Sequence, residues 1–294
     1  MLPFVSVIVP VRNDPRIRRC LRALLGQTYP ADRTELIVVD NRSSDETPAV
    51  VRQHPVTLLV ENRTLSPYAA RNRGIESARG EILAFTDADC VPDKHWLERA
   101  VAALDREGAD LVGGRVRFRY SEPARAAEIF DSLHNLDNDR SIAERGVAKT
   151  GNLCVRRRVF EAIGPFPAGR RSGGDVEWTG RASGAGFALI YAADALVAKP
   201  ARRLGPLLKK LYRVGRGQLL LWREQGEEAR VILPRIARCF RPTRPSALRA
   251  LLGERGPAGS ERQLFAVWLT SWLCSASQGA GRLHEYLRAA ISRQ

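Results

Sequence analysis

Two carboxylates one residue apart, Asp87 and Asp89, follow the short apolar run Leu83-Ala84-Phe85. Alternate residues of an extended segment point the same way, so both side chains can face one point. Like charges at that distance repel each other, and a carboxylate resists the loss of its hydration. A hard divalent cation, Mn²⁺ or Mg²⁺, would relieve the repulsion and would also bind substrate phosphates. The alternative that a bare Asp-x-Asp leaves open is a surface turn with an acidic helix cap.

Two other strand-like segments end in residues suited to ligand binding. Residues 4–9 lead into Pro10, Val11 and Arg12, and residues 36–39 lead into Asp40. A carboxylate at Asp40 could accept the ring N–H of a uracil or guanine base, or it could form a turn with a following serine. Arg71 has the fork geometry that suits phosphate, although alone it would read as a solvated helix residue.

Strands and helices that alternate along the chain would position these residues. The expected strands are 4–9, 36–39, 56–60, 81–86 and 111–118, and the expected helices are 17–25, 67–78, 94–104 and one that begins at Thr47 as N-cap. This alternation predicts an α/β fold with a mostly parallel central sheet flanked by helices. Ligands bind such sheets beyond the carboxyl ends of the strands, where the polar residues lie.

A second group of candidate residues lies later in the chain. Residues 150–155 read as a strand, and residues 122–138 could be helical. A loop rich in glycine and proline, 165–174, delivers Asp175 and Glu177 to the start of another expected helix. Asp175 taken alone is better explained by a helix cap after a glycine-rich loop than by a catalytic role.

The composition bounds the class of protein. The five cysteines are scattered, which argues against a zinc site and a disulfide framework and favours a reducing cytoplasm. We expect no signal peptide and no membrane span. Residues 199–294 hold 19 Lys/Arg and 6 Asp/Glu, a net +13, whereas residues 1–198 hold 28 and 26, a net +2. The excess positive charge therefore predicts an anionic partner for the C-terminal region.

Taken together, five segments resemble family 2 glycosyltransferases with the GT-A fold. They are SVIVPVRND, ELIVVDNRSSDET, YAARNRGIESARGEILAFTDAD, TGNLCVRRRVFEAIGPF and GGDVEWTGRASGAG, spread over about residues 4–225. The resemblance implies an inverting transferase that moves a sugar from a UDP- or GDP-linked donor to a glycan or lipid-linked acceptor, with Mn²⁺ or Mg²⁺ as cofactor. Bacterial polysaccharide, glycolipid or cell-envelope glycan synthesis would be its setting. The QxxRW motif of processive synthases is missing from the sequence, which favours a single addition.

The resemblance also implies roles for individual residues. Pro10, Val11, Arg12 and Asp40 would hold the base, Asp87 the ribose side, and Asp89 the metal on the diphosphate, with Arg71 nearby. Asp175 would be the catalytic base, with Glu177 in reserve. Gly151, Asn152 and Trp178 would lie on the acceptor side.

Two positions depart from the family pattern. The usual catalytic pair is Glu-Asp, and Gly174 replaces its first member. Many relatives have a metal-binding histidine in a stretch like V-x-H-P, where this chain has Val197-Ala198-Lys199-Pro200. A protonated lysine cannot bind a metal, but Lys199 could place its charge beside the diphosphate.

We expect a catalytic domain over residues 1–200, with a donor half at about 1–118 and an acceptor half at about 119–200. Residues 201–294 would form a basic, mainly helical region. Its amphipathic stretch Leu204–Trp222 would either dock on an anionic membrane surface, with the protein at the inner face of the membrane, or pack on the catalytic domain. A sugar nucleotidyltransferase and a non-catalytic nucleotide-binding relative are the alternative functions. No nucleic-acid-binding motif occurs, so nucleic acid is not an expected partner.

Overall fold

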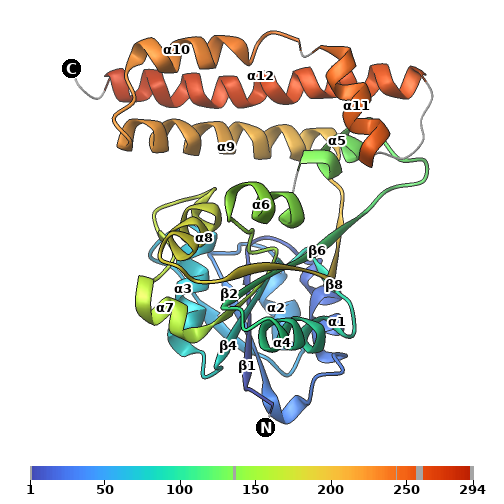
Figure 1. The fold of residues 1–294 in the computed structure, drawn as a ribbon, viewed down its shortest axis with the longest axis vertical. Helices are drawn as coiled ribbons and strands as arrows, with labels where there is room; N and C mark the ends of the chain where they lie inside the picture. The colour runs from blue at the N-terminus through green and yellow to red at the C-terminus, as the bar shows by residue number, and fades with distance from the viewer. Residues whose placement is uncertain (1, 135–136, 243, 256–260, 292–294) are drawn as a thin grey trace. The chain divides into compact units, whose positions relative to one another are not determined.

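The computed structural model describes residues 2–134, 137–242, 244–255 and 261–291. The chain forms two compact units, shown in Figure 1. Unit 1 comprises Met1–Phe118 and Leu136–Pro200, and unit 2 comprises Arg119–Asn135 and Ala201–Gln294. Each unit is described separately below.

Unit 1 is built on a single eight-stranded sheet. Its strands are β1 (Val5–Val11), β2 (Thr34–Asp40), β3 (Thr57–Val60), β4 (Ile82–Thr86), β5 (Val91–Pro92), β6 (Leu111–Arg119), β7 (Asn152–Arg156) and β8 (Leu189–Pro200), in the spatial order β3-β2-β1-β4-β7-β6-β8-β5. Strands β3, β2, β1 and β4 run parallel, as expected. Strand β7 is antiparallel to both β4 and β6, and β5 is antiparallel to β8. The sheet is therefore mixed. Its parallel half contains β1, β2 and β4, which lie in the first three segments that resemble the family.

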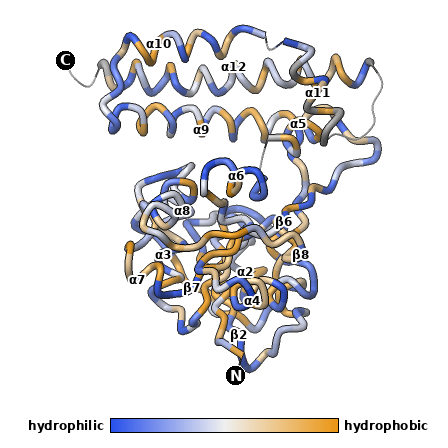
Figure 2. Tube along the Cα trace, viewed as in Figure 1, coloured by the Kyte–Doolittle hydropathy of each residue, from blue (hydrophilic) through white to orange (hydrophobic). Residues whose placement is uncertain are grey.

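Helices cover both faces of the sheet. They are α1 (Ile17–Leu25), α2 (Thr47–Arg52), α3 (Pro67–Ser77), α4 (Trp96–Arg106), α6 (Asn138–Arg145), α7 (Arg157–Ile163) and α8 (Gly174–Gly184), with a short 3₁₀ turn, η1, at Ala31–Arg33. One core packs α1, α2 and α4 on the sheet, and the other packs α3, α7 and α8 on its opposite face. The central strands β1 and β4 are buried on both faces, so they are nearly continuous hydrophobic runs. Figure 2 shows the hydrophobic residues gathered in the middle of this unit.

We expected Thr47 to be the N-cap of α2, but it is the first helical residue and Glu46 occupies the N-cap position. The Thr47 N–H donates to Asp45 Oδ1 at 3.0 Å. The Thr47 hydroxyl oxygen instead accepts from the backbone N–H of Asp14 at 2.9 Å. The side chain is thus used to hold the loop after β1, which is why it does not cap its own helix.

Unit 2 is a helical bundle. Its helices are α5 (Ala126–His134), α9 (Leu204–Glu224), α10 (Ala229–Arg238), α11 (Pro245–Arg255) and α12 (Glu261–Ile291). Helices α9 and α12 approach closely, because a Cβ at Gly215 or at Gly281 would lie 2.1 Å from a backbone oxygen of the other helix. No helix in the described part of the chain is both long enough and apolar enough to cross a bilayer.

Two expectations for this region change. Residues 119–135, which we placed in the acceptor half, belong to unit 2, because Ile129, Phe130 and Leu133 of α5 join a core with α9 and α12. The apolar side of the stretch Leu204–Trp222 packs within the bundle, where Leu207 and Leu219 are fully buried. That stretch therefore uses its apolar face for folding.

Candidate active site

The carboxyl ends of β1 and β2 lie side by side, as the parallel sheet requires. Val11 and Asp40 are partners in the register, and the N–H of Asn41 donates to the Val11 carbonyl at 2.8 Å. The two loops that follow are joined, since the N–H of Ser44 donates to Asn13 Oδ1 at 2.8 Å. Asn13 also has a positive φ of 47°, an uncommon conformation that its short polar side chain tolerates. The tips of β1 and β2 thus form one defined surface.

Asp40 is buried at this surface, and its two carboxylate oxygens have different environments. Oδ2 accepts the backbone N–H of Ser43 at 3.2 Å, which is the turn that the sequence left open as an alternative. Oδ1 is buried and has no hydrogen-bond partner among the described residues. A buried carboxylate oxygen without a donor is costly, so this atom favours a donor that a ligand would bring.

The Asp87–Asp89 pair follows β4 and is bridged by a lysine. Lys199 Nζ lies 2.8 Å from Asp87 Oδ2 and 2.8 Å from Asp89 Oδ1. The second oxygen of Asp87 accepts from Arg71 Nη2, also at 2.8 Å. The side chains of Lys199 and Arg71 are 2% and 4% exposed. The repulsion that we expected between Asp87 and Asp89 is therefore offset by two buried cationic side chains of the protein itself.

The pairing of β5 with β8 explains how Lys199 reaches the acidic pair. Ala198 lies opposite Val91 in the antiparallel register. Strand β5 begins two residues after Asp89, so the next residue of β8 falls beside the carboxylates. Lys199 therefore lies near the end of β8, at the position where the resemblance implies a metal-binding histidine in related chains.

The atoms around Asp89 decide whether a divalent cation fits here. Asp87, Asp89 and Cys90 offer ligand atoms within 4.8 Å of one another. Burial raises the pKa of the Cys90 thiol to about 12, so it stays protonated and is a poor ligand for a hard cation. Asp89 Oδ1 is paired with Lys199, and the other oxygen, Oδ2, lies 3.7 Å from Arg16 Nη2. The residues therefore fit a divalent cation through Asp89 Oδ2, with donor phosphates and water completing its coordination.

Asp175 lies in the first turn of α8, and its carboxylate is fixed by two groups. The hydroxyl of Tyr68 donates to Oδ1 at 2.9 Å, and the backbone N–H of Thr150 donates to Oδ2 at 3.2 Å. Burial raises the pKa of Tyr68 well above its usual range, so the phenol remains a proton donor. The side chain of Lys149 adds positive charge near Asp175, although burial lowers the pKa of this lysine. Asp175 is thus held in one orientation, as a catalytic carboxylate must be.

The space around Tyr68 explains why a glycine precedes Asp175. A Cβ at position 174 would lie 2.9 Å from the Tyr68 ring and 3.0 Å from Pro167. The tyrosine therefore fills the volume that a larger residue at 174 would need. Glu177, the reserve candidate, is instead paired with Arg170, whose Nε lies 3.0 Å from its carboxylate.

Helix α3 connects the two acidic groups. It carries Tyr68, which contacts Asp175, and Arg71, which contacts Asp87. The Arg71 guanidinium also lies over the Tyr68 ring, 5.6 Å from its centroid. Six residues thus form a chain of contacts, which runs from Asp175 through Tyr68 and Arg71 to Asp87, Lys199 and Asp89.

The other candidates are placed at different depths. Arg12 is exposed beyond the end of β1, and Gly151 accepts a hydrogen bond from the Thr86 hydroxyl through its carbonyl. Asn152 is buried, and its amide bonds Trp96, Arg115 and Ala195, so it joins structural elements. Trp178 is fully buried and stacks on Phe160, with 4.1 Å between the ring centroids. Asn152 and Trp178 were expected on the acceptor side, but both side chains are buried and contact other parts of the protein. Their role in this structure is to hold neighbouring elements in place.

Sequence reasoning missed Tyr68, Thr150 and Arg16. Tyr68 follows the N-cap Ser66 and Pro67 at a helix start, where it gave no sign of a polar role. Its partner lies 107 residues away in the sequence. Thr150 precedes the matched segment's Gly-Asn pair, which is a signal that could have drawn attention to it.

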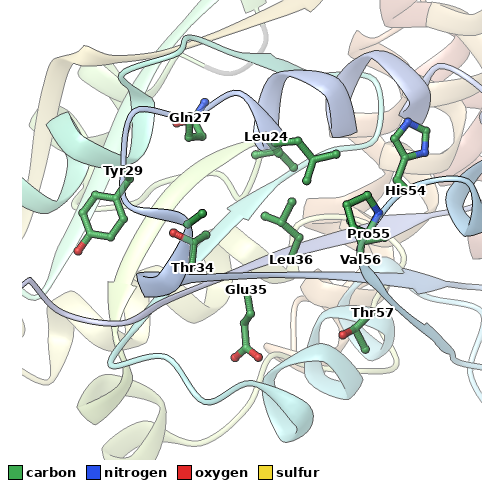
Figure 3. A pocket seen from close by; sticks show the side chains of 12 residues that line it. Leu24, Gln27, Tyr29, Thr34, Glu35, Leu36, His54, Pro55, Val56 and Thr57 are labelled. Carbon is green, nitrogen blue, oxygen red and sulfur yellow. The ribbon is translucent and has the colours of Figure 1, made fainter.

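A separate groove lies away from these residues. Figure 3 shows it between the end of α1, η1 and the first residues of β2 and β3, with Tyr29, Glu35 and His54 among its lining residues. This is the opposite end of β2 from Asp40, so the groove is distinct from the candidate active site.

Comparison with known proteins agrees with this geometry. The family model described as Glycosyl transferase family 2 matches residues 6–172. Glycosyltransferase AglE of Haloferax volcanii is 43% identical over 98% of both chains. Probable glycosyltransferase YdaM of Bacillus subtilis is 28% identical over 55% of this chain and 43% of its own length.

Solved structures show the same fold. Mannosyltransferase PcManGT from Pyrobaculum calidifontis, in complex with GDP-Man and Mn²⁺, has a TM-score of 0.66 at 23% identity, over 98% of this chain and 88% of its own. Staphylococcus aureus TarS 1–349 in complex with UDP-GlcNAc has a TM-score of 0.53 at 22% identity, over 72% and 65%. The nucleotidyltransferase alternative is not favoured by any of these matches. The chain belongs to glycosyl transferase family 2, has the GT-A fold, and is a glycosyltransferase that uses a nucleotide-sugar donor in glycan synthesis.

Proposed function

We propose that the protein is an inverting, single-addition transferase in which Asp175 is the catalytic base. The observation that carries this proposal is the carboxylate of Asp175, oriented by Tyr68 on the same helix whose Arg71 holds Asp87. An acceptor hydroxyl has a high pKa, so a fixed carboxylate must take its proton as the oxygen attacks the anomeric carbon. Attack from the face opposite the leaving nucleoside diphosphate inverts the anomeric centre.

The donor would bind across the tips of β1, β2 and β4. Pro10, Val11 and Arg12 would flank the base, and Asp40 Oδ1 would accept its ring N–H. Asp87 would hold the ribose side, while Lys199 and Arg71 would offset the charge of the diphosphate. A bound Mn²⁺ or Mg²⁺ at Asp89 would add to the neutralisation of the leaving group.

Donor base, acceptor and location are part of the same proposal. The matched structures were solved with GDP-Man and with UDP-GlcNAc, so we propose a GDP- or UDP-linked donor. We propose a glycan or lipid-linked acceptor, with Gly151 near it, and a cytoplasmic enzyme that associates with an anionic membrane surface through residues 201–294. The excess of positive charge in that region supports the last point.

A thermal-shift screen of nucleoside diphosphates and nucleotide-sugars, with and without Mn²⁺, tests donor binding. We expect one base to raise the Tm clearly, because a ligand at 100 times its Kd adds about 2.7 kcal/mol to the free energy of unfolding. Asp40→Ala should abolish the preference among bases. A flat response to every nucleotide would contradict the proposal, and release of pyrophosphate in place of nucleoside diphosphate would point to nucleotidyl transfer.

Tyr68→Phe tests the orientation of the base. Removal of the hydroxyl deletes a hydrogen bond to a charged group, which is worth about 1.5–3 kcal/mol, so kcat should fall about 10–100-fold with little change in donor affinity. Steady-state kinetics with donor titration would measure both. Tyr29→Phe is the matched control, since that hydroxyl donates to the Pro3 carbonyl away from the site. An unchanged kcat in Tyr68→Phe would remove the assigned role.

A further inference from the structure

Helix α12 presents a row of large apolar side chains to the surface. Its exposed members are Phe265, Leu269, Leu273, Leu283 and Leu287, and the first and last are 62% and 51% exposed. At 3.6 residues per turn these five positions fall within an arc of about 80°. Ala276 and Ala280 fall in the same arc and are partly exposed. We name these seven residues the α12 stripe, and it is about 33 Å long at 1.5 Å per residue.

The α12 stripe is separate from the face that folds the bundle. Val267, Cys274 and Gly281 are buried on other sides of the helix, the first two in a core shared with α5 and α9. Gly281 contacts the backbone of α9. Figure 2 shows apolar residues along α12, which runs between α10 and α9. A helix that is apolar on two faces needs a second partner, and an exposed row of this length marks an interaction surface.

The charge of unit 2 selects the kind of partner. Its two segments hold 20 Lys/Arg and 9 Asp/Glu, a net +11, whereas unit 1 holds 27 and 23, a net +4. Two copies of a unit with this charge repel each other, which disfavours self-association through the α12 stripe. An anionic bilayer surface has the opposite charge, and each nearby Lys/Arg contributes about 1 kcal/mol to binding it.

Aromatic and basic residues lie where interfacial binding would use them. Phe265 is at one end of the α12 stripe, and the partly exposed Trp272, whose indole N–H donates to the Phe240 carbonyl, lies about two turns further along the helix. Aromatic rings of this kind favour the boundary between headgroups and acyl chains. Arg262 and Arg288 are exposed near the two ends, and Arg230 and Arg238 are exposed on the neighbouring α10. Long cationic side chains can reach headgroup phosphates while the apolar row lies deeper.

We infer that α12 lies along the surface of an anionic bilayer, with the α12 stripe in the headgroup–acyl boundary. This rests on the proposed membrane partner but not on the chemistry at Asp175. It also replaces the stretch Leu204–Trp222, whose apolar face is used inside the bundle, as the membrane-binding helix. The helix lies on the surface and does not cross it, in keeping with the hydropathy of the described helices.

Co-sedimentation of the full chain with vesicles of phosphatidylcholine alone or with 30% phosphatidylglycerol tests this inference. We expect binding to the anionic vesicles that weakens at least tenfold between low and high salt. Leu269→Glu and Phe265→Glu should each weaken binding at least tenfold at low salt, because each moves a charge into the apolar boundary. Leu25→Glu, at an exposed leucine of unit 1, is the matched control and should bind like the wild type.

Two measurements keep the outcome interpretable. Circular dichroism and the nucleotide-induced Tm shift show that the variants fold and bind donor, so failure of the surface is distinguishable from failure of the proposed function. Absence of binding to anionic vesicles at low salt would overturn the inference. Equal binding by the wild type and the stripe variants would overturn it too, as would a dimer that the variants convert to monomers without any vesicle binding.

Discussion

Asp175→Asn is expected to lower the rate of sugar transfer by about 10²–10⁴-fold, the range typical of a lost general base. The amide keeps the size of the side chain and can still contact Tyr68 and Thr150, but it cannot take a proton from the acceptor. Donor binding should be retained, because the substitution leaves intact the residues that we propose for donor binding, among them Asp40, Asp87 and Lys199. Single-turnover rates with saturating donor would measure the chemical step directly.

Glu177→Gln is the matched control for that experiment. Its carboxylate is paired with Arg170, so its loss should change the rate by only about fivefold or less, the size expected for a partly exposed ion pair. If Glu177→Gln abolished transfer and Asp175→Asn did not, Glu177 and not Asp175 would be the catalytic base. If both variants kept the wild-type rate, the catalytic assignment would fail.

Lys199→Met should have the largest effect on stability. The change leaves Asp87 and Asp89 facing each other without the ammonium that lies 2.8 Å from each. Removing one partner of a buried ion pair costs about 3–5 kcal/mol, so the free energy of unfolding should fall by an amount of that order. Nucleoside diphosphate binding in the presence of a chelator should be lost as well, since one fixed positive charge is gone.

The Tm shift caused by a divalent cation shows whether Lys199→Met destabilises the protein through the lost positive charge or through altered packing. Mn²⁺ should raise the Tm of Lys199→Met more than that of the wild type, because the ion can replace the positive charge that the substitution removes from between the two carboxylates. Lys199→His should respond to Mn²⁺ in the same direction. Lys209→Met, at an exposed position of α9, is the matched control and should melt like the wild type. Identical Mn²⁺ responses in the wild type and Lys199→Met would contradict the proposed role of the ammonium.

The parallel half of the sheet was predictable because it depends on local patterns. Each strand there is a short run of β-branched or apolar residues that stops at a polar residue, and the carboxyl ends of parallel strands meet at one edge. Asp40 and Asp87 could therefore be placed together from the sequence alone. Lys199 could be placed near them only through the family resemblance, because it lies 112 residues from Asp87 and reaches it through the β5–β8 pairing. Its ion pairs with both carboxylates were not predictable from any local pattern.

Tertiary packing also decided which of the candidate residues are exposed and which are buried. Trp178 and Asn152 lie in segments that resemble the family, yet the first fills a core and the second bonds three structural elements. No periodicity in the sequence separates such residues from their exposed neighbours. In unit 2, α5 is separated from α9 by some seventy residues, so its place in the bundle depends on contacts that no local pattern reveals.

The contact between Gly174 and the Tyr68 ring constrains how this site can diverge. A side chain at 174 needs the volume that the ring occupies, and a smaller residue at 68 would leave a cavity and a carboxylate without its donor. A side chain at 174 therefore requires the Tyr68 ring to shift, and that shift would disturb its hydrogen bond to Asp175. The effects of substitutions at 68 and 174 should for this reason be non-additive.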